Sequence, residues 1–185
     1  MVRMEGVTPG FDDPLGVLRA CHRRIAERLD LLERLPEYVE LHGADASAQS
    51  AAQRVLNYFD RAAGNHHEDE EADLFPMLRR AKGRQGWDDA VPAALEQLTA
   101  EHERLARRWA QIRPSLASLA RGEHTATLST EALVRDYRAH MAVEDELILP
   151  VAAHVLDHGQ LQRLGVAMQR RRGLSPRDSA GETAE

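Results

Sequence analysis

Four long stretches of the chain carry apolar residues at alternating steps of three and four, and one histidine interrupts each stretch. Such spacing places side chains on one face of an α-helix. We therefore expect four amphipathic helices, each with a histidine in the face that must be buried. The four histidines are His22, His67, His102 and His140.

Cap and turn residues bound these helices. Asp13 and Pro14 begin the first, and Gly43 ends it. A bulge or kink is expected in the second near Gly64, because a glycine inside a helix costs about 1 kcal/mol relative to alanine. Asp88 or Asp89 should cap the third helix, and Ser129 or Thr130 the fourth. The expected spans are 13–42, 46–82, 90–121 and 130–155, with a short fifth helix over 160–169.

The expected fold class is all-α. Four long helices with short connections fold most simply as an antiparallel up-down-up-down four-helix bundle. No strand pattern competes, and an aromatic content of 4% argues against a β-sandwich or barrel. We expect a flexible arm over residues 1–12, one bundle domain over 13–170, and a disordered tail over 171–185.

Composition narrows the possible partners and the compartment. The net charge of −6 argues against a nucleic-acid partner, which would favour a basic domain. No apolar run approaches the ~20 residues that cross a bilayer, and residues 1–11 lack the apolar core of a signal peptide. The single cysteine, Cys21, permits neither an intrachain disulfide nor a cysteine zinc cluster. A cytoplasmic location is expected.

Two of the four histidines carry a glutamate one turn later. His67 precedes Glu71, and His140 precedes Glu144. Residues four apart share a helix face, with their Cβ atoms ~5–6 Å apart. Each glutamate is followed by a leucine three residues later and then by a proline, so the two motifs resemble copies. The candidate metal ligands are therefore His22, His67, Glu71, His102, His140 and Glu144.

The ligand types favour particular metals. Imidazole with carboxylate suits iron, manganese or zinc rather than copper(I). Six ligands exceed the four that a structural zinc ion usually takes. Two metal ions ~3.5–4 Å apart, bridged by both glutamates, would use all six. Iron is the first choice and manganese the second.

Neighbouring charged residues leave alternatives open at the site. His66 and Glu70 form a competing pair, but they lie one position off the face of Leu74 and are expected at the rim. Glu68, next to His67, could still reach a metal. The other residues of this stretch are expected on a solvated acidic face: Asp69, Glu70 and Asp73.

Three further features have ordinary structural interpretations. Glu101, beside His102, is expected to be a surface charge, and Tyr137 a packed core residue that could instead hydrogen-bond a ligand. The arginines at 170–172 are expected to be the solvated end of a helix.

Taken together, these motifs resemble the hemerythrin and HHE cation-binding family. The run from His66 to Pro76, Glu101 with His102, and His140 with Glu144 carry the resemblance, together with His22. It implies an antiparallel four-helix bundle that holds two non-haem iron ions, Fe²⁺ or Fe³⁺, which an oxo or hydroxo group can bridge.

The chain departs from the oxygen-carrying hemerythrins at two positions. Leu98 stands where their third helix has an additional histidine, and Asp145 stands where their fourth helix has its aspartate. We choose Glu144 over Asp145 because its spacing to Leu147 matches that of Glu71 to Leu74. The site is thus more similar to the iron-sensing domain of an F-box protein and to the repair-of-iron-centres proteins.

Three functions compete at this point. The first is a binding protein whose di-iron centre senses or holds iron, oxygen or nitric oxide. The second is an enzyme that acts on peroxide, nitric oxide or damaged iron clusters, with electrons from a protein redox partner, because the chain has no redox-cofactor motif of its own. The third is a structural bundle with zinc or with a degenerate site.

Overall fold

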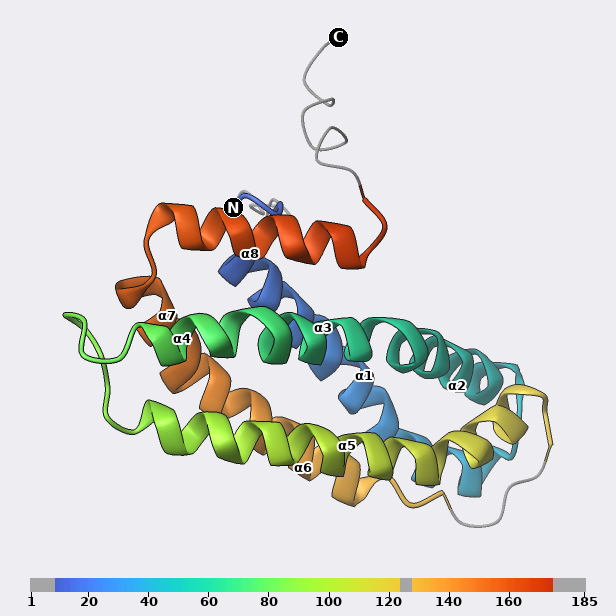
Figure 1. Cartoon of the computed structure of the whole chain (residues 1–185). Coiled ribbons are helices and arrows are strands. Elements are labelled where there is room, and N and C mark those ends of the chain that lie inside the picture. Colours follow the sequence, from blue (N-terminus) through green and yellow to red (C-terminus); the bar gives the residue numbers. More distant parts are fainter. Residues whose placement is uncertain (1–8, 124–127, 175–185) are drawn as a thin grey trace, which may run out of the picture.

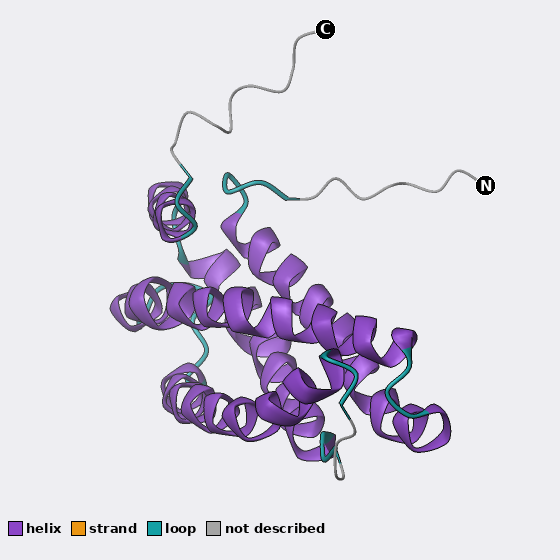
Figure 2. Ribbon diagram, turned by 90° about the vertical axis from the view of Figure 1, so that its right-hand side faces the viewer, coloured by secondary structure: helices purple, strands orange, loops and turns teal. Residues whose placement is uncertain are grey.

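The computed structural model describes residues 9–123 and 128–174, and every regular element in them is a helix (Figures 1 and 2). The all-α fold class is therefore confirmed. Most of the expected arm and tail, residues 1–8 and 175–185, lies outside the described residues. No helix in the described parts of the chain is long and apolar enough to cross a membrane.

Four helical columns make up the bundle. Two are single helices, α1 (Pro14–His42) and α5 (Val91–Ala120). The other two are continuous columns that alternate α-helical and π-helical turns. The α2–α4 column comprises α2 (Ala46–Tyr58), η1 (Phe59–Ala63), α3 (Gly64–Glu68), η2 (Asp69–Leu74) and α4 (Phe75–Arg80). The α6–α7 column comprises α6 (Glu131–Val143), η3 (Glu144–Ile148) and α7 (Leu149–Val155).

A further helix, α8 (His158–Arg171), follows the fourth column. It packs against α1 and η2 on the outside of the bundle (Figure 1). A capping box at Asp157 and Gln160 begins it. The short fifth helix expected from the sequence is thus present and slightly longer than predicted.

The cap residues agree with the sequence at the first and fourth helices and differ at the third. The Asp13 carboxylate accepts a hydrogen bond from the Gly16 N–H, and Gly43 ends α1 with a φ of 69°. Ala90, not an aspartate, is the cap residue of α5, because Asp88 instead accepts from the Ala90 N–H. Thr130 is the cap residue of α6, as one of the two expected candidates, but its hydroxyl donates across the bundle to the Leu32 carbonyl rather than capping the helix.

The bulge expected near Gly64 is confirmed, since η1 ends at Ala63. The sequence did not predict the two other π-helical segments. Glu70 lies in the first turn of η2, and Glu144 begins η3. A π-helical turn contains one residue more than an α-helical turn, and such turns are frequent at functional sites.

Two apolar clusters fill the bundle, and each column passes from one to the other at a buried polar residue. On α1, Cys21 belongs to the first cluster and Ile25 to the second, with His22 between them. The α6–α7 column passes in the reverse order, from Met141 to Ile148. A buried polar layer therefore separates the two clusters at one level of the bundle.

Docking of α8 requires a glycine at position 165. A Cβ atom there would lie 1.9 Å from the carbonyl oxygen of Phe11, which is a backbone clash. We expect Gly165→Ala to lower the free energy of unfolding by about 1–3 kcal/mol, as overpacking does. Gly159→Ala in the same helix is the control, because its Cβ would meet nothing nearer than 3.4 Å. Denaturant unfolding, with hydrogen exchange along α8, measures both; equal stabilities would contradict the prediction.

Candidate metal centre

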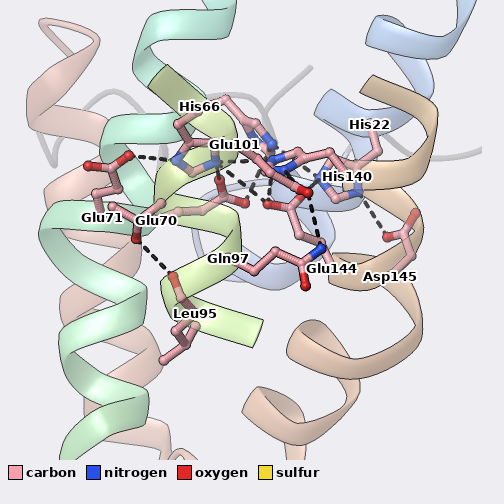
Figure 3. Close-up of polar contacts among 12 residues, drawn as sticks. His22, His66, Glu70, Glu71, Leu95, Gln97, Glu101, His140, Glu144 and Asp145 are labelled. Atoms are coloured by element: carbon pink, nitrogen blue, oxygen red, sulfur yellow. Dashed lines mark hydrogen bonds and ion pairs between the residues drawn. The ribbon is translucent and has the colours of Figure 1, made fainter. Parts of the chain in front are cut away.

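The polar layer contains seven residues that can ligate metal, contributed by all four columns. Their ligand atoms form three overlapping groups, in each of which all atoms lie within 4.8 Å of one another. The groups are His22, His66, Glu70 and Glu144; Glu70, His102, His140 and Glu144; and His67, His102 and His140. Glu70 and Glu144 each belong to two groups, and they lie between the imidazoles (Figure 3).

The Nε2 atoms of four imidazoles face the centre of the layer. On one side, His22 Nε2 lies 3.1 Å from His66 Nε2 and 3.2 Å from a Glu144 oxygen. On the other side, His102 Nε2 lies 3.1 Å from His140 Nε2 and 3.4 Å from a Glu70 oxygen. The arrangement thus has two halves that share the glutamates.

The two shared glutamates are buried without hydrogen bonds. Both side chains are almost fully shielded from solvent, and none of their four oxygens accepts a hydrogen bond of good geometry. Burying a carboxylate is costly unless a cation or hydrogen-bond donors compensate for the lost water. Metal cations between the glutamates and the imidazoles would satisfy these oxygens, so the residues present fit a metal centre.

Opposing electrostatic effects act on the two glutamates. Burial raises the pKa of Glu70 to about 7, and the negative charge of Glu144 adds to the rise. Burial would also raise the pKa of Glu144, but the close imidazole groups of His102, His140 and His22 outweigh burial and hold this pKa well below its usual value. The protein groups of the layer therefore favour the charged form of Glu144 and disfavour the charged form of Glu70.

Two imidazoles balance this negative charge. Burial alone would lower the pKa of His22, but contacts with Asp145 and Glu144 outweigh burial and raise it to about 10. His102 behaves alike, because Glu144 and Glu70 overcome its burial and raise its pKa to about 10. Cations in the site would take over the role of these two imidazolium charges.

Three carboxylates bind the outer nitrogens of the histidines. Each is the sequence neighbour of an inward-facing residue and reaches a histidine on another column. Such carboxylates fix the ring orientation and hold the proton on Nδ1, which leaves Nε2 free to ligate. The pairs are Glu71 with His102 (2.6 Å), Glu101 with His140 (3.0 Å) and Asp145 with His22 (2.9 Å).

The structure brings together five of the six ligands predicted from the sequence, the exception being Glu71. The Glu71 side chain is 42% exposed and lies on the outer nitrogen of His102. His66 and Glu70 are buried at the centre, so the expectation that they lie at the rim is wrong. The expectation that Glu101 is a surface charge is also wrong, because it is buried and contacts His140.

The spacing of apolar residues permitted both registers of the second column. Ala63 and Leu74 are both buried. Steps of three, four and four join them through His66–Glu70, whereas steps of four, four and three join them through His67–Glu71. The π-helical turns on either side of His66 set the helix phase that turns the first pair inward. The sequence did signal the alternative, because His66 and Glu70 have the same four-residue spacing as His67 and Glu71.

His67 remains close to the site. Its ring stacks on that of His102 with 4.0 Å between centroids, and its buried Nε2 has no hydrogen-bond partner. Tyr137 packs 6.0 Å from His67 and is buried, as expected for a core residue. His67 can therefore serve the half of the site that contains His102 and His140.

The two glutamates at 70 and 71 should differ in their effect on metal content. Glu70→Gln removes a buried ligand charge, so the purified protein should lose metal. Glu71→Gln removes only the partner of His102 Nδ1, so metal should remain but bind about 10–100-fold more weakly. Elemental analysis and competition with a chelator measure the two effects. If Glu71→Gln lost the metal and Glu70→Gln kept it, the ligand would be Glu71 and not Glu70.

Metal binding should release protons. His22 and His102 are protonated near pH 8, because their pKa values are about 10, and both must lose a proton to ligate. We expect ~2 protons released per chain, and affinity that falls as the pH falls, by up to about tenfold per unit for each proton. Titration calorimetry in buffers of different ionisation enthalpy counts the protons. Binding without proton release would show that neither imidazolium is displaced.

Comparison with known proteins identifies the family of this chain. The Hemerythrin HHE cation binding domain matches residues 13–152, a span that contains every candidate ligand. The chain is also 28% identical over 165 residues to an uncharacterized protein of Haemophilus influenzae, covering 88% of this chain and 91% of that protein. The chain therefore belongs to the hemerythrin HHE cation-binding domain family.

Proposed function

We propose that this protein holds a di-iron centre in an antiparallel up-down-up-down four-helix bundle, and that it senses or handles iron, oxygen or nitric oxide in the cytoplasm. The observation that carries the proposal is the sharing of Glu70 and Glu144 between two buried ligand groups. Carboxylates that belong to two groups can bridge two cations ~3.5–4 Å apart.

The ligand set divides between two cations. His22 and His66 would hold the first, and His102 and His140 the second, with both glutamates bridging. His67 supplies a further imidazole on the side of His102. Mixed imidazole and carboxylate ligands support iron first and manganese second.

A bound iron pair would supply one-electron redox chemistry and a position for a small ligand. The protein's own contribution is to hold the imidazoles and exclude bulk water. Asp145 holds the Nδ1 proton of His22, and Glu101 holds that of His140. Gln97 and Arg104 in turn donate to the second oxygen of Glu101, which fixes that carboxylate.

A surface pocket offers an approach to one end of the site. Its lining includes His22 and Asp145 together with two arginines, Arg19 and Arg23. A diatomic molecule or peroxide is small enough to approach His22 from this side. Sustained turnover would need electrons from a protein partner.

Elemental analysis tests the proposal directly. Protein produced with iron and manganese supplied should contain about two irons per chain, as the bridging mode requires. Glu144→Gln should lose them, because it removes a shared ligand, whereas Glu146→Gln, next to the site on an exposed position, should keep them. One zinc per chain, or no metal, would overturn the proposal. Spectral titration with nitric oxide then separates stoichiometric binding from turnover.

A further inference from the structure

The helix α8 is not part of the matched family region, which ends at residue 152. Its inner face nevertheless joins the first apolar cluster through Leu164 and Met168, which are fully buried. Gly165 allows the helix to approach the backbone of Phe11 closely. The chain thus adds a firmly packed element over the bundle, and α8 contacts η2, the segment that carries Glu70 (Figure 1).

The end of α8 forms ion pairs with η2. Arg171 and Arg172 both bind the carboxylate of Asp69, and Arg172 Nη2 lies 2.6 Å from Asp69 Oδ2. Arg171 also lies 2.7 Å from an oxygen of Asp73. Hydrogen bonds between ionised partners are shorter and stronger than neutral ones and fix geometry. The sequence-based expectations of a solvated acidic face and a solvated arginine end are therefore wrong at Asp69, Arg171 and Arg172.

The position of Asp69 connects these ion pairs to the metal site. Asp69 begins η2 and directly precedes Glu70, and it is fully buried. A buried carboxylate that loses its cationic partners is strongly unfavourable. The segment would then have to turn Asp69 toward water, and the neighbouring Glu70 could not keep its inward direction. The arginines therefore hold the outer side of the segment whose inner side faces the imidazoles.

We propose that Arg171 and Arg172, through Asp69, position Glu70 for metal binding, so that α8 is a working part of the metal centre. The inference rests on the proposed function. The three residues touch no candidate ligand atom, and they act by fixing the register of η2.

The following variants test whether the ion pairs position Glu70 or only hold α8 against the bundle. Asp69→Asn and the double variant Arg171→Ala/Arg172→Ala remove the ion pairs from opposite sides. Arg171→Lys/Arg172→Lys keeps the charges, so it should restore part of the effect. Arg163→Ala/Arg170→Ala is the matched control, because these exposed arginines line the outer surface of the same helix.

Cobalt(II) alone is the probe, since its visible absorption reports ligand geometry. We expect the first two variants to release cobalt to a chelator about 10–100-fold faster than wild type, as loss of supporting contacts does at metal sites. Their absorption spectrum should also change, with partial recovery in the lysine pair and none of these effects in the control. Hydrogen exchange along α8 records whether the helix stays docked.

The outcomes are distinct. Wild-type release rates and spectra in Asp69→Asn and in the double alanine variant would overturn the inference while leaving the proposed function intact. Faster cobalt release in the control as well would show that loss of positive charge on α8 is enough to cause the effect. That result would also overturn the inference. A wild-type protein that binds no cobalt would overturn both proposals.

Discussion

The burial of two carboxylates in one layer is the constraint on which the rest of the structure depends. Glu70 and Glu144 lie between two apolar clusters, where water cannot reach them and no hydrogen bond satisfies their oxygens. Such a layer is tolerable only if cations balance it. Imidazolium groups at His22 and His102 do so in the metal-free site, and metal ions would do so in the loaded one. The same residues thus serve the fold and the site.

The carboxylates around the layer act on the ligands from outside. Glu71, Glu101 and Asp145 each bind the outer nitrogen of a histidine on another column. The pairs therefore join neighbouring columns and fix the imidazoles together. Asp69 differs, because its partners are arginines and it acts on the backbone of η2 rather than on a ring. Different residues therefore orient the imidazole rings and hold the segment η2 that carries Glu70.

Sequence reasoning succeeded where local helix geometry decides the outcome. The bounds of α1, the bulge before Gly64 and the buried histidines at 22, 102 and 140 all follow from steps of three and four and from cap chemistry. It failed at positions 66–71, where two registers fit the spacing equally well. It also failed at Asp69 and Glu101. Both were expected to be solvated, but each is buried against a partner that lies far away in the sequence.

By itself, the sequence determined that four helical faces each bury a histidine and that one face carries Glu144 a turn after His140, because residue spacing alone places side chains around a helix. Only the tertiary structure decided that Glu70 rather than Glu71 faces the centre, because the choice depends on π-helical turns and on packing against other columns. The tertiary structure also brought Arg171 and Arg172 to Asp69, about a hundred residues away in the chain. No local pattern encodes that contact, since it exists only when α8 docks on the bundle.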